Sequence, residues 1–238
     1  MGVFKSSLPR TQLAHRLNAG LIGAWLFNEG SGLMLYDLSG SGAHATVTCA
    51  FPPTNPSWVA ANNGSALHFG TGATNTYAQS ANPVSVTATA FSVAAWISPT
   101  AASAGLGRII EIGDWQAQYV LGIGNGGAGT GFHFGVNGSY TGNIGASTVG
   151  QWSHVVGTWT GAAGGTGTRS LYVDGVLGEA VGGVTSPTTV GNVIITMSAY
   201  DASLNGGYTC NSPISDIRIW NRTLTRDEVN WLRMMTGP

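Results

Sequence analysis

Paired carboxylates are the first chemistry to look for in this sequence, because glycosidases need one acidic side chain as general acid and a second as nucleophile or base. The nearest pair is Glu111 and Asp114, in the run Glu-Ile-Gly-Asp. In a strand, this spacing puts the two side chains on opposite faces. The chain has only ten Asp and Glu residues, and neither a Gly-x-Ser-x-Gly elbow nor a His-Glu-x-x-His motif occurs. The sequence therefore predicts a protein that is not an enzyme.

Aromatic side chains are the second chemistry to consider, because ring faces stack on sugars while neighbouring amides bind the hydroxyl groups. Several rings fall in or beside expected loops. Loop aromatics also anchor protein interfaces, so the pattern leaves both uses open. The candidate stacking residues are Trp58, Trp115, Tyr119, Tyr140 and Tyr208.

Charged side chains are scarce, since Asp, Glu, Lys and Arg make up 8% of the 238 residues, where about a quarter is usual. No charge occurs between Asp37 and Arg108, or between Asp114 and Arg169. The net charge of −1 and the single lysine, Lys5, argue against nucleic acid as a partner. Long neutral spans leave few charges to keep copies apart, so much of the surface is expected to face other protein.

The N-terminus has no apolar core of the kind a secretory signal needs, and no stretch of the chain reaches the length of a membrane span. We therefore expect an unprocessed chain that does not contact a membrane. Cys49 and Cys210 fit no metal-binding spacing. They are expected to be two buried thiols, and a disulfide becomes the alternative if the protein is extracellular.

Short alternating apolar runs recur along the chain, separated by Gly, Asn, Pro and Ser, which is typical of an antiparallel β-sandwich or barrel. Asp174-Gly175 between apolar residues predicts a two-residue hairpin turn, because both central positions need positive φ. Residues 51–64 are expected to form a surface loop. The expected strands are 21–27, 43–48, 66–69, 91–98, 108–112, 119–123, 132–136, 152–160, 170–173, 176–181, 193–199 and 214–221.

The C-terminal segment carries the signals of a helix. Thr225 and Glu228 match a capping box, and Leu224 and Val229 match the hydrophobic staple that surrounds such a cap. Val229 and Leu232 would form a short apolar face. This helix is expected to lie against the sandwich.

Residues 1–19 are expected to form an N-terminal arm outside a domain of residues 20–238. The arm contains Pro9 and scattered apolar residues without a helical or strand period, so local structure cannot order it. Burying some of these side chains on a neighbouring chain would offset part of the ordering entropy. The residues expected to hold the arm in an assembly are Phe4, Lys5, Leu8, Arg10, Leu13, Arg16 and Leu17.

Several motifs, in order, resemble a laminin-G-like domain of the concanavalin A-like jelly-roll class. They are the opening strand and turn at 20–32 and 36–44, the strands at 66–70 and 91–97, the pair at 152–156 and 171–175, and the final strand and helix at 217–229. The resemblance covers about residues 20–234. It implies an all-β fold, an antiparallel β-sandwich with a short C-terminal helix.

The family includes glycan binders, protein binders, domains that accompany enzymes and virion surface proteins, so the fold does not choose among them. Its glycosidases carry a Glu-x-Asp-x-Glu signature, which is absent here. Many relatives bind calcium, but residues 70–72 are Gly-Thr-Gly where an acid often stands, and Asp37 and Asp201 are isolated candidates. We expect no cofactor, with a structural calcium left open. His154 is expected to be a packed imidazole, hydrogen-bonded within the sandwich.

These observations favour a structural subunit of a virus particle, such as a capsid-decorating or fibre-associated protein. It would lie at the virion surface and pack on other protein subunits through its arm and neutral faces. The alternative is a carbohydrate-binding module of the same class, with an extracellular location. Exposed rings in a cleft would favour the module, whereas an arm running over a neighbouring subunit would favour the particle.

Overall fold

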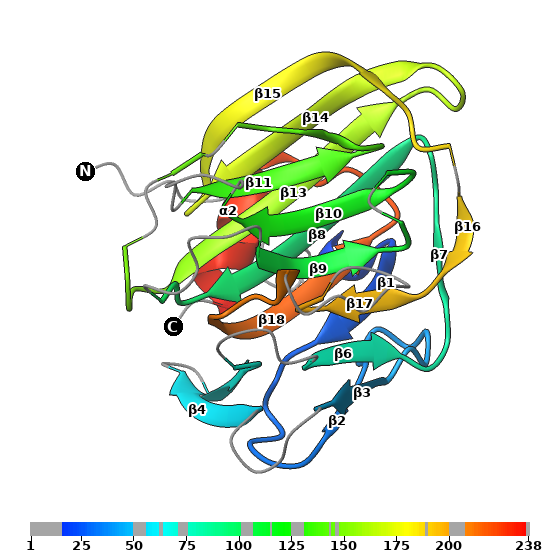
Figure 1. Ribbon diagram of the computed structural model, residues 1–238. Helices are drawn as coiled ribbons and strands as arrows, with labels where there is room; N and C mark the ends of the chain where they lie inside the picture. The colour runs from blue at the N-terminus through cyan, green and yellow to red at the C-terminus, as the bar shows by residue number, and fades with distance from the viewer. Residues whose placement is uncertain are drawn as a thin grey trace.

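Two antiparallel β-sheets lie face to face in the computed structural model of the protein (Figure 1). The structure describes residues 16–49, 56–61, 64–70, 76–100, 107–114, 116–124, 131–142, 144–145, 148–188, 190–199 and 208–236. This arrangement confirms the predicted all-β sandwich.

The first sheet contains, in spatial order, β15 (Val176–Thr185), β14 (Thr166–Val173), β13 (Ser153–Gly161), β8 (Ala90–Ile97), β18 (Pro213–Trp220), β5 (Gly64–His68) and β4 (Ser57–Ala61), and β1 (Leu21–Trp25) also pairs with β18. The second contains β12 (Ser139–Tyr140), β11 (Phe132–Val136), β10 (Tyr119–Ile123), β9 (Gly107–Ile112), β17 (Ile195–Met197), β6 (Tyr77–Ser80), β3 (Ala45–Thr48) and β2 (Met34–Leu35). A separate ladder joins β16 (Gly191–Val193) to β7 (Val84–Val86).

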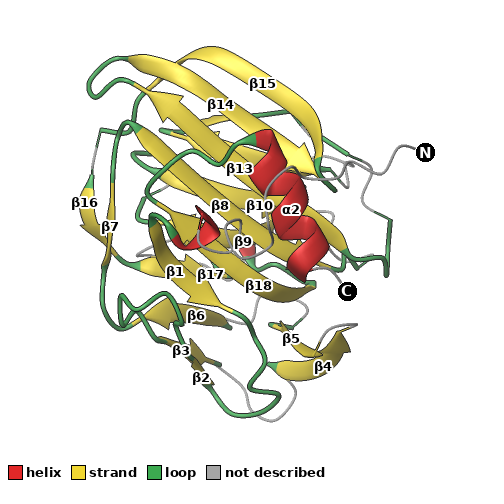
Figure 2. Cartoon of the chain, turned by 180° about the vertical axis from the view of Figure 1, so that it is seen from behind, coloured by secondary structure: helices red, strands yellow, loops and turns green. Residues whose placement is uncertain are grey.

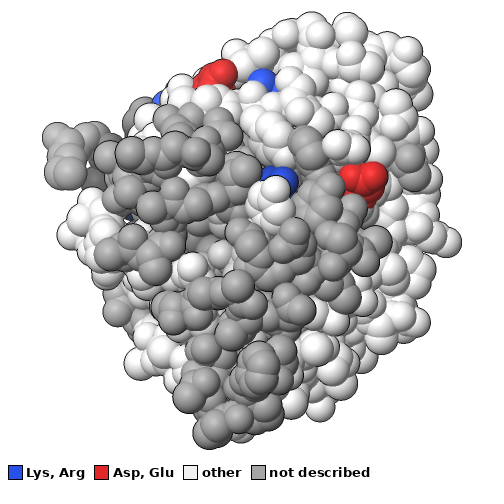
Figure 3. Space-filling view, in the orientation of Figure 1, with Lys and Arg blue, Asp and Glu red and all other residues white. Residues whose placement is uncertain are grey.

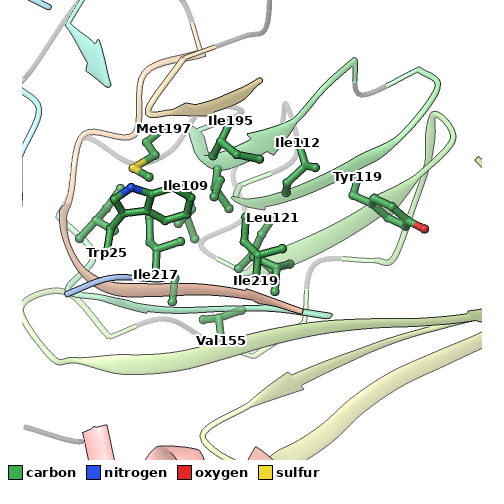
Figure 4. Packing of buried hydrophobic residues seen from close by; sticks show 14 of the residues in the cluster. Trp25, Ile109, Ile112, Tyr119, Leu121, Val155, Ile195, Met197, Ile217 and Ile219 are labelled. Atoms are coloured by element: carbon green, nitrogen blue, oxygen red, sulfur yellow. The ribbon is translucent and has the colours of Figure 1, made fainter. Parts of the chain in front are cut away.

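The hydrophobic core fills the space between the two sheets, because each strand turns alternate apolar side chains inward. Trp25 and Ile217 of the first sheet and Ile109 and Met197 of the second are all fully buried in it (Figure 4). The indole of Trp25 donates to the carbonyl oxygen of Ala43 at 2.9 Å. Its one polar group is therefore satisfied inside the core.

The predicted hairpin at Asp174-Gly175 is confirmed. Val173 pairs with Val176 across the turn, and φ is 52° at Asp174 and 81° at Gly175. Both central residues are thus left-handed, as a two-residue turn of this kind requires.

The predicted C-terminal helix is also confirmed as α2 (Arg226–Thr236). The Glu228 carboxylate accepts from the backbone N–H of Thr225 at 2.8 Å, and the Thr225 hydroxyl accepts from the N–H of Glu228 at 3.3 Å, which is the capping box. Figure 2 shows α2 lying on the outer face of the first sheet. There Val229 and Leu232 pack with Trp220 of β18 in a second, smaller apolar cluster.

The described end of the N-terminal arm packs on its own domain, which corrects the expectation for Arg16 and Leu17. Residues 16–18 are helical, and Leu17 is buried in the cluster beneath α2. Its carbonyl oxygen accepts from the indole of Trp220 at 2.6 Å, and the Arg222 guanidinium donates to the carbonyl oxygen of Arg16 at 2.7 Å. The other expected arm residues, Phe4, Lys5, Leu8, Arg10 and Leu13, lie outside the described residues.

The expected loop over 51–64 is wrong in part, because it contains β4, which pairs along its whole length with β5. The short strands β6 and β7 were not expected either. In β6 the inward residues are Ala78 and Ser80, which are too small to produce a visible apolar alternation. Strand pairing with β3 and β17 fixes this segment instead.

Candidate functional site

A pocket of about 250 Å³ opens on the outer face of the first sheet, next to the last turn of α2. Its floor comes from β8 and β18, and its walls come from the segment after β1, from β4, from the residue before β13 and from α2. Two tryptophans and one ion pair dominate the lining, which consists of Leu26, Asn28, Ala61, Trp96, Trp152, Ser215, Asp216, Arg218, Met235 and Thr236.

A β-bulge in β18 brings Asp216 and Arg218 into this pocket together. The register with β8 shifts between Ser215 and Arg218, so one residue more stands on β18 than on its partner. Asp216 takes a left-handed φ of 46° at the bulge. As a result Ile217 still points into the core, while Arg218 lies on the outer face.

Asp216 and Arg218 form a bidentate ion pair, with Nε to Oδ1 at 2.6 Å and Nη2 to Oδ2 at 3.0 Å. The two side chains are only 13% and 21% exposed. Burial raises the pKa of Asp216 above its ordinary value, although the positive charge of Arg218 acts in the opposite direction. The donors of Arg218 and the acceptors of Asp216 thus lie side by side in a partly buried site.

The two tryptophans of the pocket differ in how deeply they are buried. Trp96 is nearly buried, and its indole donates to the Thr236 hydroxyl at 2.8 Å, which in turn donates to the carbonyl oxygen of Leu232 in α2. Its ring also lies 5.0 Å from the ring of His154. Trp152 is half-buried and offers part of its surface to the pocket. A ring face beside a donor and acceptor pair can bind an amphipathic ligand such as a sugar.

Tyr140 and Tyr208 are the two predicted stacking residues that the structure brings together, and they lie on the other sheet, away from the pocket. The Arg108 guanidinium lies 5.5 Å from the centroid of each ring. Arg108 also donates to the Tyr140 hydroxyl at 3.0 Å and pairs with Glu111 at 3.4 Å. These rings therefore stack on a protein cation.

The prediction that Tyr119 binds a ligand is wrong, because its ring is fully buried in the core. It stacks on Phe91 at 4.0 Å, and its hydroxyl donates to the carbonyl oxygen of Thr87 at 2.7 Å. Trp58 lies half-buried on β4, with its indole bound to the carbonyl oxygen of Gly32 at 3.0 Å. Trp115 lies outside the described residues.

The two carboxylates considered for hydrolysis do not share a site. Glu111 is fully buried next to Arg108, whereas Asp114 is exposed in the turn after β9, where it accepts from the N–H of Gln116 at 2.9 Å. The described part of the pocket lining contains one carboxylate, that of Asp216.

Asp37, a calcium candidate, uses its carboxylate to accept hydrogen bonds from the protein itself. It accepts from the backbone N–H groups of Ala24, Ser39 and Ala43 and from the hydroxyls of Ser39 and Ser41, at 2.8 to 3.1 Å. Although burial opposes it, this set of hydrogen bonds lowers the pKa of Asp37. Across the described ranges no cluster of three His, Cys, Asp or Glu side chains could hold a metal, and Asp201 lies outside them.

His154 is packed as expected, and burial lowers its pKa to about 3, with the nearby Arg233 and Arg218 acting in the same direction. Its Nδ1, however, has no hydrogen-bond partner among the described residues.

Cys49 and Cys210 are free thiols, and burial raises the pKa of Cys210 to about 12. No helix in the described part of the chain is long and apolar enough to cross a membrane.

The sequence reasoning missed the four residues that carry the pocket: Trp96, Trp152, Asp216 and Arg218. One signal could have indicated the bulge. The apolar residues of the last strand fall at Ile214 and then at Ile217 and Ile219, so their parity changes within the strand. A change of parity predicts an extra residue on one strand and a polar side chain displaced to the outer face.

Comparison with known proteins places the chain in a broad group. A family model described as the concanavalin A-like lectin/glucanases superfamily matches residues 71–230. Among curated protein sequences, none matches the chain.

Solved structures share the fold at low sequence identity. Domain 4 of AbnA, an extracellular arabinanase from Geobacillus stearothermophilus in complex with arabinotriose, matches with a TM-score of 0.63 and 16% identity, over 89% of this chain and 97% of that one. The ligand-binding domain of botulinum neurotoxin serotype D in complex with N-acetylneuraminic acid has a TM-score of 0.62 and 14% identity, over 94% of this chain and 52% of that one. The chain thus spans about half the length of the toxin domain.

Proposed function

The chain belongs to the concanavalin A-like lectin/glucanases superfamily, and from this premise we propose that it is a non-catalytic carbohydrate-binding domain whose ligand enters the pocket beside α2. The observation that carries the proposal is the pairing of Trp152 with Asp216 and Arg218 in one cavity. Sugars present an apolar ring face and a rim of hydroxyls. An indole can stack on the apolar ring face, and a carboxylate with a guanidinium can hydrogen-bond to the hydroxyls.

The structural relatives support this function over the particle subunit that the sequence favoured. One is a domain bound to arabinotriose and another a domain bound to N-acetylneuraminic acid. Neither relative is a virion protein. The carbohydrate-binding module, the alternative from the sequence, is therefore the better-supported prediction. The virion surface location and the contacts with other subunits stay predictions from sequence alone, although charged side chains are sparse among the described residues of the face in Figure 3.

The non-catalytic part of the proposal is supported by the carboxylates. Acid and base catalysis of glycoside hydrolysis normally takes two carboxyl groups about 5–10 Å apart across the scissile bond. In the pocket lining, the described residues supply Asp216 alone, and Arg218 holds it in an ion pair. Such a carboxylate is suited to accept hydrogen bonds from a ligand.

The test is to measure binding of the protein to an array of immobilised glycans, and then to titrate the best glycan against variants by calorimetry. If Trp152 covers about 60–100 Å² of apolar surface on contact with a sugar, Trp152→Ala should cost about 1.5–2.5 kcal/mol, or about 10- to 70-fold in Kd. Tyr36→Ala is the matched control, because Tyr36 is an exposed ring, 53% exposed, beside β2 of the other sheet. Its affinity should be unchanged.

Two results would contradict the proposal. One is that no glycan on the array is bound. The other is that a glycan is bound with the same affinity by Trp152→Ala as by the wild type, which would place the site elsewhere.

A further inference from the structure

We infer that the pocket recognises one uncharged sugar ring at the end of a glycan, through two neighbouring hydroxyls that bind the Asp216–Arg218 pair. This inference rests on the proposed function and narrows it to a ligand class. It follows from the size of the pocket, from its charge and from the geometry of the ion pair.

The volume of the pocket fits a single sugar ring. Ligand pockets for drug-sized molecules measure roughly 300–1,000 Å³, and this one measures about 250 Å³. The last turn of α2, with Met235 and Thr236, and Asn28 after β1 stand at its sides. A ring inside a glycan chain has substituents leaving in two directions, whereas a terminal ring has one. A pocket with room for one ring therefore suits the terminal ring, whose single linkage can leave through the open side.

The charge of the pocket favours an uncharged ligand. Asp216 and Arg218 are the charged residues of the described lining, and their formal charges cancel. A sugar acid would bring a carboxylate close to Asp216 with no unpaired cation in that lining to offset its desolvation. A neutral sugar meets no such cost.

The geometry of the ion pair fits two adjacent hydroxyls. Each hydroxyl can donate one hydrogen bond and accept another. Arg218 directs Nε and Nη2 at the two oxygens of Asp216, so carboxylate acceptors and guanidinium donors lie within 3.0 Å of each other. One hydroxyl of a vicinal diol can donate to Asp216 while its neighbour accepts from Arg218, which adds charge-assisted hydrogen bonds without separating the pair.

The backbone at Asp216 gives independent support. Asp tolerates a left-handed backbone better than most residues, and Asp216 uses one, with a φ of 46°, at the bulge in β18. Glycine would relieve this conformation but would remove the carboxylate. Residues held in such conformations cluster at ligand sites. The bulge that carries this carboxylate is therefore a backbone feature of the kind that recurs beside ligand sites.

The experiment uses the full chain, and it follows the indole N–H signal of Trp152 by NMR during titration. The probes are the methyl pyranosides of glucose, galactose and mannose, the methyl glycosides of glucuronic and galacturonic acid, and one trisaccharide of each neutral sugar, namely maltotriose, β-1,4-galactotriose and β-1,4-mannotriose. At least one neutral methyl glycoside should shift the signal, and its acid counterpart should bind about tenfold or more weakly. A trisaccharide ending in the preferred ring should bind within about fivefold of the single ring.

Two variants separate recognition from folding. Asp216→Asn should weaken the affinity for the neutral methyl glycoside by about 10- to 100-fold, which is the range for hydrogen bonds to charged groups. Because this variant leaves Arg218 uncompensated, the ratio of acid to neutral affinity should rise, which a merely structural role would not cause. Asp227→Asn, in the exposed first turn of α2, is the matched control and should change neither affinity. If Asp216→Asn does not fold, the inference is tested by the wild-type protein alone, through its preference for the neutral glycoside over the acid counterpart.

The outcomes distinguish the two proposals. If neither a glycan of the array nor any of these probes perturbs Trp152, the proposed function and this inference fall together. If a glycan of the array perturbs Trp152 but no neutral methyl glycoside does, the function stands and the inference is wrong. If a sugar acid binds in the pocket as tightly as its neutral counterpart, or affinity rises tenfold or more with added rings, the function stands and the inference is wrong.

Discussion

Removal of residues 1–19 should destabilise the domain by more than removal of residues 1–15, because only the longer deletion takes Leu17 away. The shorter deletion keeps Leu17, which is 4% exposed against Trp220 and Leu224. The longer one loses this burial, about 1.5–3 kcal/mol, and strips the Trp220 indole of its acceptor, about 1–3 kcal/mol more. The free energy of unfolding should therefore fall by about 2.5–6 kcal/mol, a large part of the 5–15 kcal/mol typical of a whole domain.

Urea unfolding followed by tryptophan fluorescence measures both deletions on the same scale. Leu17→Ala in the full chain is a milder version, with an expected loss of about 2–3 kcal/mol and no change in backbone length. The reasoning is refuted if the chain that starts at Gly20 unfolds at the same urea concentration as the full chain. Equal losses from both deletions would refute it as well, because they would show that residues 1–15 carry the stability.

The other predictions concern the hairpin and the pocket. Gly175→Val should destabilise the protein by about 1–3 kcal/mol in urea, because a β-branched residue is forced to positive φ. Gly164→Val, at φ 68° with open space around it, should lose less stability, because a Cβ at Gly175, but not one at Gly164, would also meet a neighbouring side chain, that of Asn230. Equal losses would show that this contact does not matter. Glycan affinity should be full at neutral pH and fall on acidification, with a midpoint above the ordinary pKa of Asp, because burial raises the pKa of Asp216 and binding needs its ionised form. His154, whose pKa is about 3, stays neutral through this range, so a profile unchanged by Asp216→Asn would contradict the assignment.

Features set by neighbouring residues were predictable from the sequence. The Asp174-Gly175 turn and the Thr225–Glu228 cap are decided within a few residues by φ preferences and capping hydrogen bonds, and both were predicted correctly. The alternation of large apolar residues also located β10 and β11.

The pocket was not predictable in the same way, because it depends on sheet order and on one change of register. Trp96 and Arg218 are far apart in the sequence and meet only because β8 and β18 are neighbours. Tyr119 is an error of the opposite kind, because it was predicted to belong to a ligand site and does not. A tyrosine at a strand edge was expected to face a ligand, but tight packing between the sheets buried its ring, and one backbone carbonyl satisfied its hydroxyl.

The place of β18 in the sheet has a consequence for how the protein is made. This late strand lies in the middle of the first sheet, between β8 and β5, and it also pairs with β1 and supports Leu17. During synthesis on the ribosome, β1 emerges long before β18, the strand it pairs with, and β8 can pair with β13 while its other edge stays open until β18 appears. The nascent domain cannot close until translation has passed β18, so its early strands are the part of the chain that chaperones would need to protect.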